Sequence, residues 1–126
     1  MFKFSYNSKH KIITAIIVII WAVFHFVNED NKDNYYKNGQ IKRIGAFNNG
    51  KNSGKWVWYY ENGNKKMEGA FINGKRDGLW LTWDKKGNKL TEGNYKEDKL
   101  NGTFIRWDAI GNIIEQLEYQ NDVSFK

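Results

Sequence analysis

GKWVWYYENGNKKMEGAFINGKRDG, residues 54–78, decides the fold of this chain. The stretch begins and ends on glycine, and the run 55–60 is rich in aromatic and β-branched residues that favour strands. Asn62-Gly63 follows this run and is a strong hairpin signal, because both residues of a tight two-residue turn must accept a positive φ. A second glycine-rich connector, residues 73–78, then leads onward. The stretch therefore predicts one β-hairpin and the connector to the next.

The same pattern recurs at a constant interval of 24 residues. Three glycine columns keep this spacing: Gly39, Gly63, Gly87 and Gly111; Gly54, Gly78 and Gly102; Gly45, Gly69 and Gly93. Three aromatic columns keep it too: Trp56, Trp80 and Phe104; Phe47, Phe71, Tyr95 and Tyr119; Tyr35, Tyr59, Trp83 and Trp107. A fixed period of this length is the signature of a repeat architecture in which each unit touches its neighbours. We therefore expect an all-β, elongated antiparallel meander of repeated β-hairpins over 35–126, with about eight short strands.

A two-residue turn at Asn62-Gly63 would also fix the strand register. Counting outward from it, Tyr60 faces Lys65, Trp58 faces Met67 and Trp56 faces Gly69. The same count places Trp80 opposite Gly93. A large indole would then lie over a residue without a side chain, which explains why a strand-weakening glycine stands there.

These columns resemble the MORN-repeat superfamily, and most closely its bacterial variant, the YwqK-type antitoxin-like repeat proteins. The matching residues are Gly54, Trp56, Tyr59 and Gly63, then Gly78, Trp80, Trp83 and Gly87, then Gly102, Phe104, Trp107 and Gly111. Tyr35, Gly39, Gly45 and Phe47 supply a partial leading unit, so the resemblance covers 35–119. It implies 24-residue hairpin repeats that work through protein or membrane contacts, and its family label implies an antitoxin.

The N-terminal segment 12–27 is distinct from the repeats. It holds no formally charged side chain and, as a helix, would span roughly 24 Å. Basic residues precede it and acidic residues follow it, so the positive-inside rule places 1–11 in the cytoplasm and the repeats on the outer side. We expect an uncleaved transmembrane signal-anchor at 12–27, a linker at 28–34 and the repeat domain at 35–126. A cleaved signal peptide and a buried soluble helix are the alternatives.

Several kinds of chemistry are not indicated. The net charge of +6 is mild and mixed, which argues against nucleic acid as a partner. The chain has no cysteine, and both histidines, His10 and His25, precede the repeats. The P-loop-like stretches 45–51 and 69–75 lack the Ser or Thr that holds Mg²⁺ in such loops. We therefore expect no enzyme, no cofactor and no metal site.

We therefore expect the function to depend on the exposed surface of the sheet. Strand alternation places the column of Tyr35, Tyr59, Trp83 and Trp107 on the face opposite Trp56 and Trp80, and we call it the Tyr–Trp row. Together with Lys42 and Lys66 it is the predicted partner-binding strip, since contiguous exposed aromatic residues mark interaction sites. The alternative is that both rows only pack the sheet.

Three functions follow from these features. The first is a membrane-anchored, non-enzymatic repeat module that binds an unidentified protein on the extracytoplasmic side. The second is an immunity or antitoxin protein that binds a toxin. The third is an envelope glycan-binding module that uses its aromatic side chains for sugar stacking.

Overall fold

The computed structural model describes residues 8–125, and it describes side chains over 12–25 and 32–125. The chain divides between Asp33 and Asn34 into a helical unit and a unit of β-hairpins. The predicted cytoplasmic segment 1–11 lies outside the residues whose side chains are described.

The first unit contains one helix, α1 (Ser8–Lys32), which covers the predicted segment 12–27 and most of the predicted linker. No Gly or Pro interrupts the sequence between 8 and 32, so nothing ends the helix earlier. Large apolar side chains are exposed along it at Ile12, Ile13, Ile16, Ile17, Val18, Ile19, Ile20, Trp21, Val23 and Phe24. Among the described residues, no helix combines the length and the apolarity that crossing a membrane requires. The predicted transmembrane helix is therefore not confirmed.

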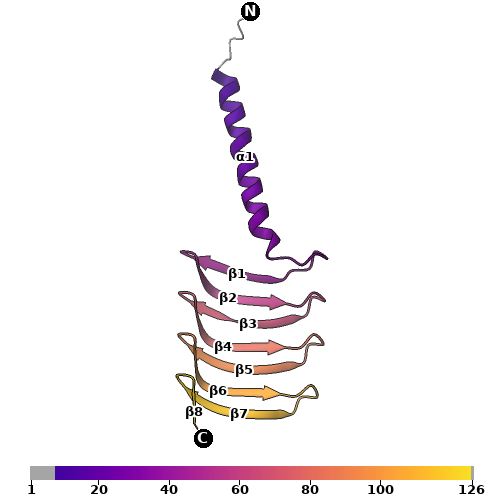
Figure 1. Ribbon diagram of the computed structural model, residues 1–126, viewed down its shortest axis with the longest axis vertical. Helices are drawn as coiled ribbons and strands as arrows, with labels where there is room; N and C mark the ends of the chain where they lie inside the picture. The colour runs from indigo at the N-terminus through magenta and orange to yellow at the C-terminus, as the bar shows by residue number, and fades with distance from the viewer. Residues whose placement is uncertain (1–7, 126) are drawn as a thin grey trace, which may run out of the picture. The chain divides into compact units, whose positions relative to one another are not determined.

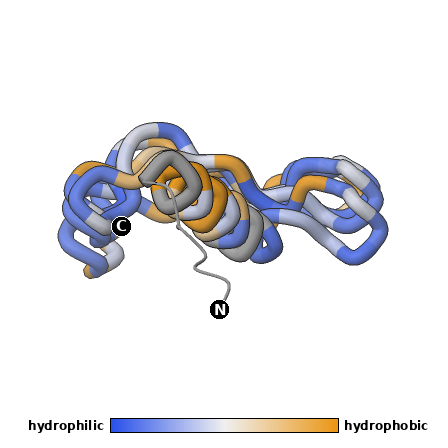
Figure 2. Tube along the Cα trace, turned by 90° about the horizontal axis from the view of Figure 1, so that it is seen from above, coloured by the Kyte–Doolittle hydropathy of each residue, from blue (hydrophilic) through white to orange (hydrophobic). Residues whose placement is uncertain are grey.

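The second unit is a single eight-stranded antiparallel sheet, and its strands pair strictly in chain order (Figure 1). The strands are β1 (Arg43–Asn48), β2 (Lys51–Tyr59), β3 (Lys65–Ile72), β4 (Lys75–Trp83), β5 (Lys89–Lys96), β6 (Lys99–Trp107), β7 (Ile113–Gln120) and β8 (Val123–Phe125). Figure 2 looks along the stack: the hairpins overlie one another, and hydrophilic residues gather at the turns. The predicted all-β meander of hairpin repeats is confirmed.

A single layer of sheet has little interior, and the core of this one is correspondingly small. Among the described residues the buried apolar side chains are Trp56, Val57 and Trp80, which are 2%, 9% and 6% exposed. Trp56 and Trp80 stand on one face of the sheet and Val57 on the other. Much of the remaining aromatic surface is only half-buried, which leaves both faces available for contacts.

The tight two-residue turns lie in the connectors between repeats, whereas the prediction placed one in the central loop. The connectors are the tight two-residue turns, at Asn49-Gly50, Asn73-Gly74, Glu97-Asp98 and Asn121-Asp122, and both residues of each have positive φ. The central turn at Asn62-Gly63 is a three-residue loop instead. In it Gly63 N–H donates to Tyr60 O, Tyr60 N–H donates to Asn64 O, and only the glycine has positive φ.

This longer loop changes the register only next to the turn. Tyr59, not Tyr60, pairs with Lys65, so the predicted Tyr60–Lys65 pair is wrong. An irregularity between Trp58 and Tyr59 then absorbs the extra residue. Beyond it the predicted pairs Trp58–Met67, Trp56–Gly69 and Trp80–Gly93 are confirmed.

Each indole nevertheless leans over a different glycine from the one predicted. A Cβ built on Gly69 would overlap the Trp80 ring, and one built on Gly45 would overlap the Trp56 ring. Each tryptophan thus covers the glycine of the preceding strand rather than its partner in the following one. Bulges cause this lean: Glu68 pairs with Leu81 but Ala70 with Asp77, so residues 78–80 bow out opposite Gly69. Gly78 accommodates the bulge with a φ of 77°.

Candidate binding groove

The predicted partner-binding strip lies on the face opposite the buried tryptophans. Tyr35 is 48% exposed, whereas Tyr59, Trp83 and Trp107 are half-buried. Lys42 and Lys66 are exposed, and neither pairs with its tyrosine across the central loop; Lys42 instead neighbours Tyr59 on the other side, where Tyr59 N–H donates to Lys42 O at 2.9 Å. Tyr35 pairs with Ile41 and Tyr59 with Lys65, because the central loops are one residue longer than expected.

Other lysines cover the row instead. Lys65 Nζ lies 5.6 Å from the centre of the Trp83 ring, and Lys89 Nζ lies 4.8 Å from that of Trp107. Each ammonium is also held by a glutamate, Glu68 at 2.8 Å and Glu92 at 2.9 Å. The hydrogen bond from Lys65 holds the pKa of Glu68 below its ordinary value. The row is therefore screened by paired charges and is less open and less basic than expected.

The other face, which we call the aromatic face, carries a nearly continuous series of ring contacts. Trp58 stacks on Trp56 with centroids 5.6 Å apart and lies 5.8 Å from Trp80. Phe71 meets Trp80 edge-on at 5.0 Å. Such offset and edge-on arrangements are the preferred geometries of aromatic pairs. Trp58 was not among the predicted site residues because it belongs to no repeating column.

The aromatic face is hollowed into one groove of about 360 Å³, within the range of about 300–1,000 Å³ typical of ligand sites. We call this hollow the aromatic groove. Its apolar wall is formed by Trp58, Met67, Phe71, Trp80, Tyr95 and Phe104. Polar groups line it at Arg76, Thr82, Thr91 and Asp98. A mostly apolar hollow with a few convergent polar groups is the usual character of a binding site.

Two threonines supply polarity inside the groove. Thr82 and Thr91 are cross-strand partners on β4 and β5, and their hydroxyl oxygens lie 2.6 Å apart. One hydroxyl donates to the other, so the second hydroxyl hydrogen is left without a partner among the described side chains. The groove can therefore offer one hydrogen-bond donor to a bound group and also accept from it.

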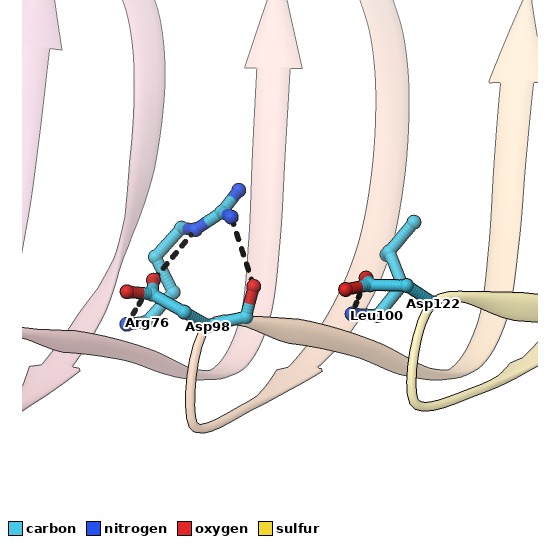
Figure 3. Close-up of polar contacts among 4 residues, drawn as sticks. All are labelled: Arg76, Asp98, Leu100 and Asp122. Atoms are coloured by element: carbon cyan, nitrogen blue, oxygen red, sulfur yellow. Dashed lines mark hydrogen bonds and ion pairs between the residues drawn. The ribbon is translucent and has the colours of Figure 1, made fainter.

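Arg76 and Asp98, which both line the groove, form an ion pair (Figure 3). Arg76 Nε donates to Asp98 Oδ1 at 3.0 Å, and the guanidinium carbon lies 4.1 Å from the centre of the Tyr95 ring. Asp98 Oδ1 also accepts from the Arg76 backbone N–H at 2.9 Å. These backbone and side-chain hydrogen bonds hold the pKa of Asp98 below its ordinary value. The charged form of Asp98 is thereby favoured, and Arg76 is fixed over the tyrosine.

The same device recurs one repeat later. Asp122 Oδ1 accepts from the Leu100 backbone N–H at 2.7 Å. Figure 3 shows that the turns with Asp98 and Asp122 each contact the preceding hairpin. Asp98 N–H and Asp122 N–H also donate to Arg76 O and Leu100 O. The connector turns thus tie successive repeats together at one end of the strands.

The polar groups that line the groove are few. Within the part of the chain that the structure describes, no three His, Cys, Asp or Glu side chains gather as metal ligands. Its polar groups are a threonine pair and a closed ion pair, neither of which is a nucleophile activated by an adjacent base. What the groove offers a ligand is ring surface with a small number of hydrogen bonds.

The fold defines a class of protein: a linear array of β-hairpin repeats with one aromatic face. The family model described as MORN repeat variant matches this chain at residues 34–49, 53–73 and 76–97. The repeats of this chain therefore belong to the MORN repeat family. The final hairpin, β6–β7, continues the same geometry beyond the matched residues. No curated protein sequence matches the chain.

Proposed function

We propose that this protein is a non-enzymatic, membrane-held module that binds a protein partner through the aromatic groove. The observation that carries the proposal is the groove itself, because ring surface from five successive strands, β2 to β6, converges on one hollow of about 360 Å³. Aromatic side chains supply much of the binding energy at protein interfaces. The partner contributes a segment with apolar side chains, which complement the groove's wall.

The membrane part of the proposal rests on α1. Its exposed apolar side chains occur at successive positions from Ile16 to Trp21 and therefore surround the helix rather than form one stripe. A helix that is apolar on all sides is stable when protein or lipid covers it. Lipid is the cover we propose, with the N-terminus in the cytoplasm and the repeats outside, because the lysines precede the segment and the acids follow it.

A site-specific photo-crosslink tests the protein-binding function. A photoreactive side chain at Thr91, inside the groove, should form an adduct with one polypeptide when the full chain is expressed in its own cells. The same group at Lys85, on an exposed turn of the same sheet, is the matched control and should not form that adduct.

The identity of the adduct separates the three functions. A polypeptide that is toxic when expressed alone would make the protein an immunity protein, which is one form of the proposed function. An adduct with a cell-wall glycan, or equal adducts from both positions, would contradict the proposal.

A further inference from the structure

Three residues occupy equivalent places on the aromatic face, one per repeat: Trp58, Thr82 and Arg106. Their cross-strand partners are Met67, Thr91 and Glu115. The same place therefore holds an apolar pair, a hydroxyl pair and a charged pair in three successive repeats. Since the surrounding backbone repeats, the chain itself shows what this place can accommodate.

Trp58 shows how the place is filled by a ring. It stacks at 29° on Trp56, lies 5.8 Å from Trp80 and meets Phe71 edge-on at 6.2 Å. The indole of Trp58 thus occupies the space between the tryptophans of two successive repeats. The aromatic contacts run unbroken from Phe47 to Trp80 as a result.

One repeat later the ring is missing and the space is open. The residues equivalent to those around Trp58 are Trp80, Tyr95 and Phe104, and all three line the groove together with Thr82 and Thr91. Among the described rings, none bridges Trp80 and Phe104 in the way that Trp58 bridges Trp56 and Trp80. We call this part of the groove the Thr82 pocket.

In the third repeat a charged pair fills the equivalent position. Arg106 Nε lies 3.1 Å from Glu115 Oε2, so this pair satisfies itself across the two strands. The Thr82 pocket is therefore the one of these three places that combines small side chains with ring walls.

We propose that the Thr82 pocket binds one tryptophan or tyrosine side chain of the partner, in the position that Trp58 takes one repeat earlier. This inference rests on the proposed function for the source of the ring, but the pocket's preference is a property of the groove alone. Trp80 and Phe104 provide ring surface on two sides, which favours a planar aromatic group over an aliphatic one.

The threonine pair favours a ring that carries a polar edge. An indole N–H or a phenol O–H that enters the pocket meets the two hydroxyls, which can accept its hydrogen, and a phenol oxygen can accept the hydroxyl hydrogen left over by the Thr82–Thr91 bond. A phenylalanine ring would cover these hydroxyls without bonding to them, and burying polar groups unpaired is unfavourable. The expected order is therefore tryptophan and tyrosine before phenylalanine, and phenylalanine before leucine.

Small amides of single amino acids test the pocket directly on the purified full chain. N-acetyl-tryptophanamide should shift the methyl resonances of Thr82 and Thr91 in an NMR titration, whereas N-acetyl-leucinamide should bind at least tenfold more weakly. Equal affinity for the two amides, or no shift at either threonine, would overturn the inference.

Filling the pocket from within provides the matched variants. Thr82→Trp should remove binding of the tryptophan amide, because the chain's own indole would take the place. The double variant T82W/T91M recreates the Trp58–Met67 pair, which the fold already accommodates, and it serves if the single variant folds poorly. Leu79→Trp adds an indole at an exposed position of the same strand and should leave binding unchanged.

The partner then separates this inference from the proposed function. A partner that crosslinks from the photoreactive group at Thr91 should lose its adduct when Thr82→Trp is introduced into the same chain, and an adduct of unchanged yield would overturn the inference while the protein-binding function stands. If the tryptophan amide binds the pocket but no polypeptide crosslinks, the pocket assignment stands and the proposed function fails.

Discussion

Trp80 lies over Gly69, the glycine of the strand before it, although its backbone pairs with Gly93 in the strand after it. The bulge at residues 78–80 turns the indole backwards, so the glycine and the tryptophan that depend on each other are 11 residues apart. Each repeat is thereby locked to its predecessor by a ring that has no room for a side chain beneath it.

Gly69→Ala should destabilise the chain, because the new Cβ would overlap the buried Trp80 ring. Overpacking of this kind costs about 1–3 kcal/mol in unfolding free energy. Gly93→Ala is the matched control: its Cβ would meet Phe104 at 3.0 Å and Leu100 at 3.1 Å, which are tight contacts rather than an overlap. Denaturant unfolding should rank the two variants in that order, and equal losses would contradict the lean described above.

Replacing the tryptophans of the two faces should separate packing from binding. Trp80 is 6% exposed, so Trp80→Ala should cost about 3–5 kcal/mol of stability, as large core truncations do. Trp83 is half-buried beneath Lys65, and Trp83→Ala should cost less than about 3 kcal/mol.

The same Trp83→Ala variant decides between the groove and the Tyr–Trp row as the binding surface. Partner crosslinking from Thr91 should persist in it, since the row lies on the other face. Loss of the adduct in a folded Trp83→Ala protein would instead favour the row predicted from the sequence.

Acid should weaken the link between the connector turns. The pKa of Asp98 is lower in the folded chain than its ordinary value of 3.8, so its contribution to stability is present above that pH and is lost as the pH falls through the folded pKa. Asp98→Asn keeps an acceptor for the Arg76 N–H but removes the charge. Because Asp98 is half-exposed, the difference between the two proteins at neutral pH should stay below about 1 kcal/mol. The two stability curves should converge below pH 3.8, and parallel curves would show that this ion pair contributes nothing.

The proposed topology is tested at the C-terminal end of the chain. A reporter that is active only in the cytoplasm, fused after Lys126, should be silent if α1 holds the repeats on the outer side. A reporter active only outside should work in the same fusion. Cytoplasmic activity, or a mature protein that begins after Val27, would contradict an uncleaved anchor.

The periodic features of this fold were predictable from the sequence, because a 24-residue period marks equivalent positions without any knowledge of geometry. The turns were harder, since Asn-Gly occurs both in the central loop at Asn62-Gly63 and in the connector at Asn73-Gly74. A usable signal is present nonetheless. Glycine stands in all four central loops, where one residue needs positive φ, whereas the connectors accept Asp98 and Asp122 in place of glycine.

The candidate site was harder to predict for a different reason. The 24-residue period identifies residues that recur in every repeat, but the aromatic groove depends on residues that differ between repeats. Trp58 is a tryptophan only in its own repeat, and the open pocket arises where Thr82 stands in its place. The lean of Trp80 over the preceding glycine depends on a bulge, which alternation of side chains along a strand does not reveal.

The strict chain order of strands β1 to β8 has a kinetic consequence. Every strand pairs only with its sequence neighbours, so each pairing closes a short loop and the entropy lost in any one step is small. Folding can therefore start in any hairpin and spread in both directions. Opening should begin at the three-residue strand β8, and amide hydrogen exchange should slow from there toward the amides beside Trp56 and Trp80.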